Sequence, residues 1–348
     1  MSFRAAPLRR TLSAALRDVV SDNAGARASA VADLVAHVDA GRLLVLPPLE
    51  RALGDEAAAV RSAAAVALAD VRGVEALPKL LLAVEDDDPH VRQMAIAAIG
   101  EIGDGRARER LRRALSDARP EVRFQAVIAF SRVAPDDAVD AIARALDDSD
   151  ASIRYIALRC AEERTLGHDQ AATPALLAKA VSLVDDSDPS VRVAAAILLA
   201  RSGDRRGQPI LLDVVRQNVK TPEAEDEAAA VELTGELGIA EASSHLERRA
   251  FGFFGFGEDR FAWQALVSLA RMGHERARSK ILRDLGSWWR DRRTLAVAAV
   301  GRAKLTEARP IVEAMIGDER RADGDTVALT LEQLGTSADD GRHSRGAS

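Results

Sequence analysis

The side chains that most often carry out chemistry in proteins are scarce in this sequence and widely separated. No two histidines have the i, i+4 spacing that lets one helix face present two ligands to zinc; they are His37, His90, His168, His245, His274 and His343. Neither the Gly-x-Ser-x-Gly turn of a nucleophilic serine nor a Walker phosphate loop occurs. The glycines of GFFGFG (252–257) follow no predicted strand. We therefore predict no catalytic residue, no metal site and no cofactor.

The single cysteine, Cys160, also has a structural interpretation. It lies six residues after Arg154, where comparable segments of the chain have Ala67, Ala98, Ala129 and Leu198. A small core residue is therefore expected there, and free cysteine commonly fills that role. One cysteine cannot form an internal disulfide, which favours a reducing compartment, so we expect a cytoplasmic protein.

The most regular chemical feature is a carboxylate followed, six residues later, by a guanidinium. The aspartates are Asp55, Asp86, Asp117, Asp148 and Asp186, and the matching arginines are Arg61, Arg92, Arg123, Arg154 and Arg192. The first four arginines recur at one constant interval, and the last follows after a slightly longer one. A β-branched residue precedes each arginine, and an alanine follows it by three residues. A fixed period of this length indicates a repeat architecture.

Each repeat must hold these residues with a pair of short helices. An aspartate in the turn can accept a backbone N–H and start a helix, and Pro89, Pro120 and Pro189 suit a first helical turn. The alanines allow a neighbouring helix to come close. The second half of each repeat, such as 78–84 or 141–146, has apolar residues at helical spacing. One such pair cannot bury its apolar faces alone, so the repeats must stack.

This line, D-x-D-P-x-V-R at 86–92 and 186–192 with variants at 55–61, 117–123 and 148–154, resembles the HEAT-repeat superfamily. It is most similar to the short bacterial HEAT-like, or phycobilisome-lyase-like, repeats. The resemblance extends roughly over 20–335 and implies an all-α solenoid of about ten stacked helix-turn-helix repeats, with the period that the arginines define. We expect one solenoid over 1–335, with a capping helix in 1–20, and a disordered polar tail over 336–348.

Enzymes occur among proteins with such repeats, but their known features do not transfer. The resemblance to deoxyhypusine hydroxylases would require several His-Glu pairs that hold iron, and only His274-Glu275 occurs. No residue here marks the bilin attachment of the HEAT-like lyases. A related DNA glycosylase uses aromatic and acidic residues on a basic face, which directs attention to the C-terminal third. We expect no enzyme, with a lyase, hydroxylase or DNA-repair role as the alternatives.

Two interpretations of the repeated arginines are open. They could form a basic row that awaits an acidic partner. Alternatively, each could bind an aspartate or helix-end carbonyls in its own or the adjacent repeat. The arginines and aspartates would then pair within the fold in a regular series, which we call the ladder. The fixed recurrence of Asp with Arg favours the ladder. Exposed pairs of this kind contribute only about 0.2–1 kcal/mol each, so stacking of apolar helix faces is expected to supply most of the stability.

The C-terminal third differs in composition. Eight of the twelve aromatic residues lie between 251 and 289: Phe251, Phe253, Phe254, Phe256, Phe261, Trp263, Trp288 and Trp289. Residues 245–310 have 14 Lys and Arg against 7 Asp and Glu, a local charge of +7. The aromatic rings could plug a gap in the core, with both late tryptophans packed on the plug, or they could form an exposed patch that binds a partner.

A second candidate contact stripe follows the residue after each repeated arginine. At this place stand Phe124 and Tyr155, in adjacent repeats. Side chains at equivalent positions of stacked repeats line one face, which solenoids commonly use for binding. The two rings could equally cover the joint between repeats.

Overall composition limits the classes of partner. The 348 residues are 47% apolar and 3% aromatic, with a net charge of −6. A protein that grips nucleic acid along its length is expected to be basic, so we do not expect nucleic acid as the main partner. No run of about 18 apolar residues suggests a membrane span. We predict a non-catalytic scaffold or adaptor that binds another protein; nucleic-acid binding through the basic, aromatic third is the alternative.

Overall fold

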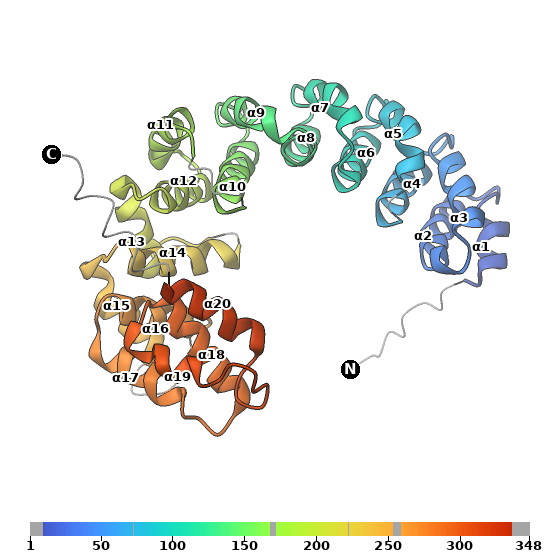
Figure 1. Ribbon diagram of the computed structural model, residues 1–348. Coiled ribbons are helices and arrows are strands. Elements are labelled where there is room, and N and C mark those ends of the chain that lie inside the picture. Colours follow the sequence, from blue (N-terminus) through green and yellow to red (C-terminus); the bar gives the residue numbers. More distant parts are fainter. Residues whose placement is uncertain (1–9, 72, 168–171, 222, 253–258, 336–348) are drawn as a thin grey trace. The chain divides into compact units, whose positions relative to one another are not determined.

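The computed structural model describes residues 10–335 except 72, 168–171, 222 and 253–258. Within these residues the chain forms twenty α-helices and no β-strand. It divides into two compact units, Met1–Lys179 (unit 1) and Ala180–Ser348 (unit 2). Each unit is a series of helix pairs, shown in Figure 1, so the fold is an α-solenoid, as the sequence predicts.

Unit 1 contains two rows of helices. The first helices of its repeats pack side by side, and each is followed by a second helix on the same side of the row, as Figure 1 shows. The first helices are α2 (Ala24–Val35), α4 (Ala58–Asp70), α6 (Pro89–Ile102), α8 (Pro120–Val133) and α10 (Ala151–Gly167). The second helices are α3 (Val38–Ala52), α5 (Leu77–Ala83), α7 (Arg108–Ala114) and α9 (Ala138–Ala145), while α11 (Pro174–Ser182) spans the division between the units.

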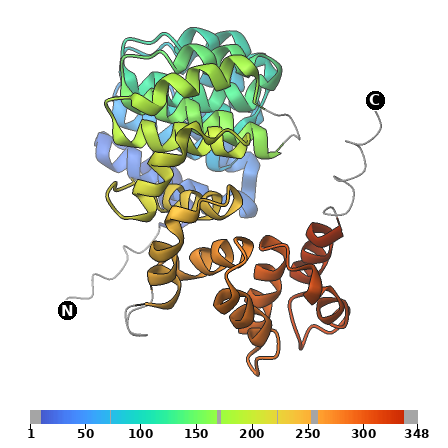
Figure 2. The same ribbon diagram turned by 90° about the vertical axis from the view of Figure 1, so that its left-hand side faces the viewer.

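Unit 2 repeats the arrangement, and Figure 2 shows its helix pairs from a second side. Its first helices pack in series: α12 (Pro189–Arg201), α14 (Ala224–Glu236), α16 (Ala262–Arg271), α18 (Arg290–Arg302) and α20 (Gly324–Gly335). Its second helices are α13 (Gln208–Val215), α15 (Ser243–Phe251), α17 (Glu275–Asp284) and α19 (Arg309–Glu313). The two units together have ten first helices among the described residues, which matches the predicted number of repeats.

A short 3₁₀ turn leads into most second helices. The turns are Val74–Ala76, Gly105–Ala107, Pro135–Asp137, Arg205–Gly207, Ala240–Ala242 and Thr306–Ala308, with a further one at Leu183–Asp185. In the repeats that have it, this turn keeps the connection between the paired helices short. Each second helix packs against the first helix of the following repeat, as α5 does against α6 in unit 1 and α15 against α16 in unit 2.

Small residues allow the first helices to approach one another. Ala64, Ala95, Ala126 and Ala157 are fully buried along unit 1, between larger core residues such as Leu68, Ile96 and Phe130. Glycine allows a still closer approach: a Cβ on Gly100 of α6 would lie 3.0 Å from the Ala129 Cβ of α8. The alanine-rich composition is thus a direct consequence of close helix stacking.

The Asp-rich turns start the first helices. In the turns before α6 and α12, two aspartates have different roles, which the sequence pattern alone does not distinguish. Asp88 caps α6, because its Oδ1 accepts the backbone N–H groups of His90 at 2.8 Å and Val91 at 3.2 Å. Asp188 caps α12 in the same way. The earlier aspartate, Asp86, instead accepts the N–H of Asp88 at 2.9 Å and so fixes the turn itself.

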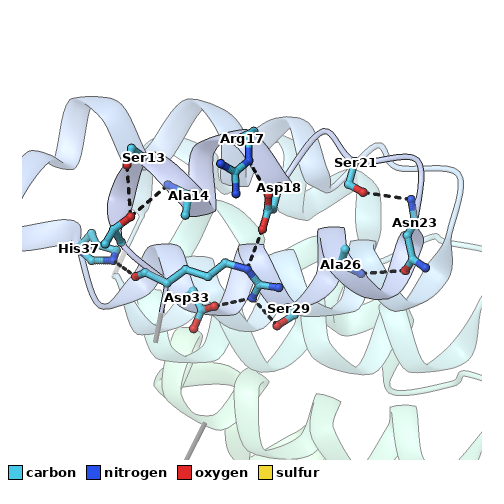
Figure 3. A network of polar contacts seen from close by, with 12 residues as sticks. Ser13, Ala14, Arg17, Asp18, Ser21, Asn23, Ala26, Ser29, Asp33 and His37 are labelled. Atoms are coloured by element: carbon cyan, nitrogen blue, oxygen red, sulfur yellow. Dashed lines mark hydrogen bonds and ion pairs between the residues drawn. The ribbon is translucent and has the colours of Figure 1, made fainter. Parts of the chain in front are cut away.

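A polar network ties α1 (Leu12–Asp18) to α2 at the start of the described chain, and Figure 3 shows it from close by. Arg10 donates to Asp18 at 2.9 Å, to Ser29 at 2.7 Å and to Asp33 at 2.6 Å. The His37 ring nitrogen Nε2 lies 2.8 Å from the Arg10 carbonyl. These contacts join α1 to the first repeat, where a capping helix is expected.

Candidate functional site

The repeated arginines and aspartates meet across neighbouring repeats. Arg92 donates Nε and Nη2 to the two carboxylate oxygens of Asp117 in the next repeat, both at 2.9 Å. Its Nη1 donates to the carbonyls of Asp86 at 2.8 Å and Asp87 at 3.2 Å. Arg61 with Asp86, and Arg123 with Asp148, have the same arrangement. All three guanidinium nitrogens of these arginines are thus engaged within the fold.

The ladder begins earlier than the sequence pattern indicates. Arg27 donates to both carboxylate oxygens of Asp55 at 2.8 Å and to the carbonyls of Ser21 and Asp22. The pattern misses it because its interval to Arg61 is longer than the interval between the regular arginines. Farther along, Arg154 and Arg192 make the same Nη1 contacts with the carbonyls six and five residues before them.

Most of each ladder pair is shielded from water. The side chains of Arg123 and Asp148 are each 15% exposed, so the pairs are more buried than the sequence interpretation assumed. Burial raises the pKa of Asp148, but hydrogen bonds from Arg123 and the Asp150 N–H outweigh it, and the net pKa lies below its ordinary value. The same balance lowers the pKa values of Asp86 and Asp117. That these pairs serve the fold alone stays a prediction.

The ladder is interrupted in unit 2. The helix positions equivalent to the arginines are occupied there by Arg192, Glu227, Ala262, Arg293 and Gly324. Arg249, only 5% exposed, donates to Glu227 and also lies 3.1 Å from Asp259. Its guanidinium lies over the Phe261 ring, at 5.5 Å from the centroid. Where unit 1 has an arginine on the first helix paired with an aspartate, this repeat has Glu227, and the buried Arg249 of α15 neutralises it.

Arg293 keeps half of the ladder geometry. Its Nη1 donates to the carbonyls of Ser287 and Trp288, six and five residues earlier, as in unit 1. Its other nitrogens donate to the backbone carbonyls of Arg320 and Arg321, each at 2.7 Å, where unit 1 has a carboxylate. The turn before α18 is thereby aligned with the Asp-rich turns, and Trp288 and Trp289 occupy the places of Asp87 and Asp88.

The structure separates the predicted aromatic residues into different environments. Trp288 is 92% exposed and Trp289 is 72% exposed, so the interpretation in which both pack on a core plug is wrong. Trp263 and Phe251 are half-buried, beneath the guanidinium groups of Arg302 and Arg276 respectively. Phe261 is buried. Phe253, Phe254 and Phe256 lie outside the described residues, so their part in a contact surface stays a prediction.

A groove of about 600 Å³ adjoins the exposed tryptophan pair. It shares Ser287 and Arg293 with the turn, and its floor is largely apolar. The lining residues are Leu285, Gly286, Ser287, Arg293, Pro310, Ile311, Ala314, Met315 and Arg321. Two large exposed rings therefore lie beside an apolar groove in unit 2.

Phe124 and Tyr155 lie on adjacent first helices, α8 and α10, which pack together. Both side chains are half-buried. This placement fits both interpretations made from the sequence, a contact stripe and a cover for the joint between repeats. Their binding role stays a prediction.

Comparison with known proteins agrees with this geometry. A family model described as HEAT repeats matches residues 78–162, which include the regular ladder from Arg92 to Arg154. These residues match HEAT repeats, and the chain as a whole resembles a HEAT-like repeat protein. No curated protein sequence shows significant similarity to it.

Solved structures support the HEAT-like fold. The Escherichia coli protein YibA is similar over 75% of this chain and 93% of its own, at 19% identity and a TM-score of 0.54. The complex of CpcE and CpcF of phycocyanin lyase from a Nostoc species covers 71% of this chain and 96% of its own, at 20% identity. Its TM-score is 0.45, so we draw no argument from that likeness. At these identities the fold alone is shared.

Two side chains capable of chemistry, Cys160 and His274, are each engaged by their surroundings. Burial raises the pKa of the Cys160 thiol to about 11, which keeps it protonated. His274 Nε2 lies 2.8 Å from Glu247, not from its neighbour Glu275. Among the described residues, no group of three or more His, Cys, Asp and Glu side chains is placed to hold a metal ion. No described helix has the length and apolar character needed to cross a membrane.

Proposed function

We propose that this HEAT-like repeat protein is a non-catalytic scaffold that binds another protein through the tryptophan turn, defined as residues 287–289 and the groove beside them. The observation that carries the proposal is the exposure of two adjacent tryptophans, at 92% and 72%. Tryptophan and arginine dominate the energetics of protein interfaces. Large apolar side chains left together on a surface commonly mark such a site.

The turn is held in place before any partner arrives. The Trp289 N–H lies 3.3 Å from Ser287 Oγ, and the carbonyls of Ser287 and Trp288 accept bonds from Arg293. Both tryptophans therefore sit on a fixed backbone. A partner would have to order only the side chains, which lowers the entropic cost of binding.

The surroundings indicate the chemistry of the partner. Arg290 and Arg292 lie within three residues of Trp289 and pair with Glu319 and Asp284, but their side chains remain 44% and 56% exposed. Residues 245–310 have a charge of +7. A partner that inserts an apolar side chain into the groove and presents acidic residues at its rim fits this surface. The buried, lone cysteine agrees with the cytoplasmic location that we propose.

Photo-crosslinking in cells of the native host tests this proposal. A benzoylphenylalanine at position 288 is expected to capture a defined protein, and the double variant Trp288→Ala, Trp289→Ala is expected to lose that protein in a pull-down. Leu43→Ala is the matched control, because Leu43 is 89% exposed but lies in unit 1. Both variants are expected to keep their helicity and their melting temperature, since surface substitutions usually change stability by less than about 0.5 kcal/mol.

Two results would contradict the proposal. The first is an identical set of partners for wild type and the double tryptophan variant, with both proteins folded. The second is capture of nucleic acid in place of protein at position 288, retained at physiological salt and lost with the tryptophans, which would favour stacking of bases on the two rings.

A further inference from the structure

A second groove, of about 500 Å³, lies on unit 2 where the first helices end. Its charged lining comes from consecutive repeats and lies in or just after the last turns of α12, α14, α16 and α18. The lining residues are Arg201, Glu232, Glu236, Val267, Ser268, Arg271, Gly301, Arg302, Lys304 and Gln333. We refer to it as the basic groove, because four cations face two carboxylates.

Both carboxylates of the basic groove already have partners. Arg302 Nη1 lies 2.6 Å from Glu232, and Arg271 Nη1 lies 3.2 Å from Glu236. Arg271 also donates to the Arg302 carbonyl at 3.1 Å, and the Arg302 guanidinium lies over the Trp263 ring at 5.1 Å from the centroid. The two arginines are therefore fixed, and the lining keeps an excess of positive charge.

Lys304 has no ion pair among the described residues, and its backbone is unusual. Its φ is 53°, in the left-handed region that side chains rarely adopt. The N–H of Leu305 bonds the Val300 carbonyl at 3.0 Å, which closes a Schellman motif after α18 with Lys304 at the glycine position.

The other repeats show which residue this position normally takes. Lys304 stands eleven residues after Arg293, and Gly103 and Gly203 stand eleven residues after Arg92 and Arg192. Gly238 and Gly273 end α14 and α16 in the same way, and all four glycines have a positive φ. Glycine would relieve the strain at 304, so the lysine stands there against the conformational preference of its own turn.

We infer that the basic groove binds a carboxylate of an acidic peptide segment, with Lys304 as its principal contact. This inference rests on the proposed role as a protein-binding scaffold but concerns a different surface. A lysine without a partner among the described residues, beside two arginines held by other contacts, offers charge-assisted hydrogen bonds to one or two carboxylate oxygens. Glu232 and Glu236 in the same lining disfavour a continuous polyanion such as a nucleic-acid backbone. A peptide, whose carboxylates are separated by neutral backbone, meets no such repulsion.

The test uses the full chain and fluorescence anisotropy at physiological salt. The probes are a fluorescein-labelled Glu-Gly-Ser repeat peptide, its Gln-Gly-Ser counterpart, and oligothymidine of matched charge. Wild type is expected to bind the Glu peptide in preference to both others. Lys304→Gly and Lys304→Asn are expected to weaken this binding about tenfold, through loss of one charge-assisted contact, whereas Lys304→Arg keeps most of it.

Stability separates this effect from damage to the fold. Lys304→Gly is expected to raise the melting temperature while it weakens binding, because glycine suits the left-handed conformation. Gln217→Gly is the matched control: Gln217 has a φ of 64° after α13 and does not line the basic groove. This control is expected to raise the melting temperature and leave peptide binding unchanged.

Three results overturn the inference: no saturable binding of the Glu peptide at millimolar concentration, binding that Lys304→Gly leaves unchanged, or a preference for oligothymidine. The tryptophan variants keep the two proposals apart. Trp288→Ala with Trp289→Ala is expected to leave peptide binding intact, so loss of the basic groove's ligand and loss of the partner captured at position 288 are independent observations.

Discussion

The two units use the same helical pair but handle charge differently. In unit 1, Arg27, Arg61, Arg92 and Arg123 each bind the aspartate of the next repeat, and each also bonds two carbonyls of its own turn. In unit 2 the equivalent positions include Glu227 and Ala262, and Arg293 binds only backbone carbonyls. The regular repeats of unit 1 thus pair their charges within the fold. The altered repeats of unit 2 have exposed cations and tryptophan rings instead.

This contrast explains where the candidate surfaces lie. In an Asp-rich turn, the capping aspartate, the paired aspartate and the backbone carbonyls already make hydrogen bonds within the fold. Few of its polar groups are therefore available to bind a partner. When the turn before α18 replaces two aspartates with Trp288 and Trp289, the backbone geometry is kept and the side chains become exposed. Likewise, Lys304 keeps a helix end that glycine forms elsewhere and adds a cation. In both candidate surfaces, the backbone keeps the geometry of the other repeats, and only the side chains differ.

The largest expected effect concerns the glycines at which first helices touch. A Cβ on Gly235 of α14 would lie 2.5 Å from the Cα of Ser268 in α16, so backbone would have to move. Ser268 is buried and donates to the Val231 carbonyl at 2.8 Å, a bond that the movement would strain. We expect Gly235→Ala to lower the free energy of unfolding by about 3 kcal/mol.

Gly100→Ala in unit 1 is the comparison for that variant. Its Cβ would lie 3.0 Å from another Cβ, that of Ala129, and alanine gains about 1 kcal/mol of helix propensity over glycine. We expect a change of less than about 1 kcal/mol, because the two effects oppose each other. Urea denaturation can follow each unit separately, because all three tryptophans lie in unit 2 and Cys160, a thiol-labelling site once exposed, lies in unit 1. An equal loss of unfolding free energy in the two variants would contradict the prediction, because it would mean that α6 and α8 pack as closely as α14 and α16.

A smaller effect is expected from the ladder itself. Arg123→Ala removes two bonds to Asp148 and leaves that carboxylate, 15% exposed, without its cation. We expect a loss of about 2 kcal/mol, since an abandoned, largely buried charge costs more than a surface pair contributes. Arg293→Ala abandons only carbonyls and is expected to cost about 1 kcal/mol. Thermal melts at neutral pH measure both, and a larger loss for Arg293→Ala would reverse the comparison.

The sequence predicts the repeat well because its signals are local. An aspartate, a proline and an arginine within one turn and one helix are close in the chain, so the constant period is visible without a structure. The pairing of Arg92 with Asp117 joins different repeats, yet it too follows once the repeats are known to stack. Arg27 and Arg293 fall outside the sequence pattern, because Arg27 departs from the period and Arg293 has no aspartate six residues before it.

The candidate surfaces were less predictable, for a different physical reason. Whether Trp288 and Trp289 are core or surface depends on which way one turn faces, and no local pattern of apolar residues specifies that. The role of Lys304 depends on its φ, and a lysine after a helix is an ordinary sequence feature. The offset of eleven residues that separates Gly103 from Arg92 and Gly203 from Arg192 would have pointed to position 304, eleven residues after Arg293.

The smallest effect is a dependence on pH that the Arg123 pair of unit 1 should show and Arg293 of unit 2 should not. The pKa of Asp148 lies below its ordinary 3.8 in the folded protein, so the pair with Arg123 stabilises the fold fully above that value. The stabilisation is lost as the pH falls through the lower, folded pKa; Asp117 and Asp150 also act on the Arg123 guanidinium. The difference in stability between wild type and Arg123→Ala should therefore shrink as the pH drops below about 4. Arg293 binds carbonyls, which do not titrate, so the deficit of Arg293→Ala should stay level over the same range. Urea midpoints measured from neutral pH down to about pH 3 decide the matter: a parallel loss for both variants would mean that the acid response does not come from the ladder carboxylates.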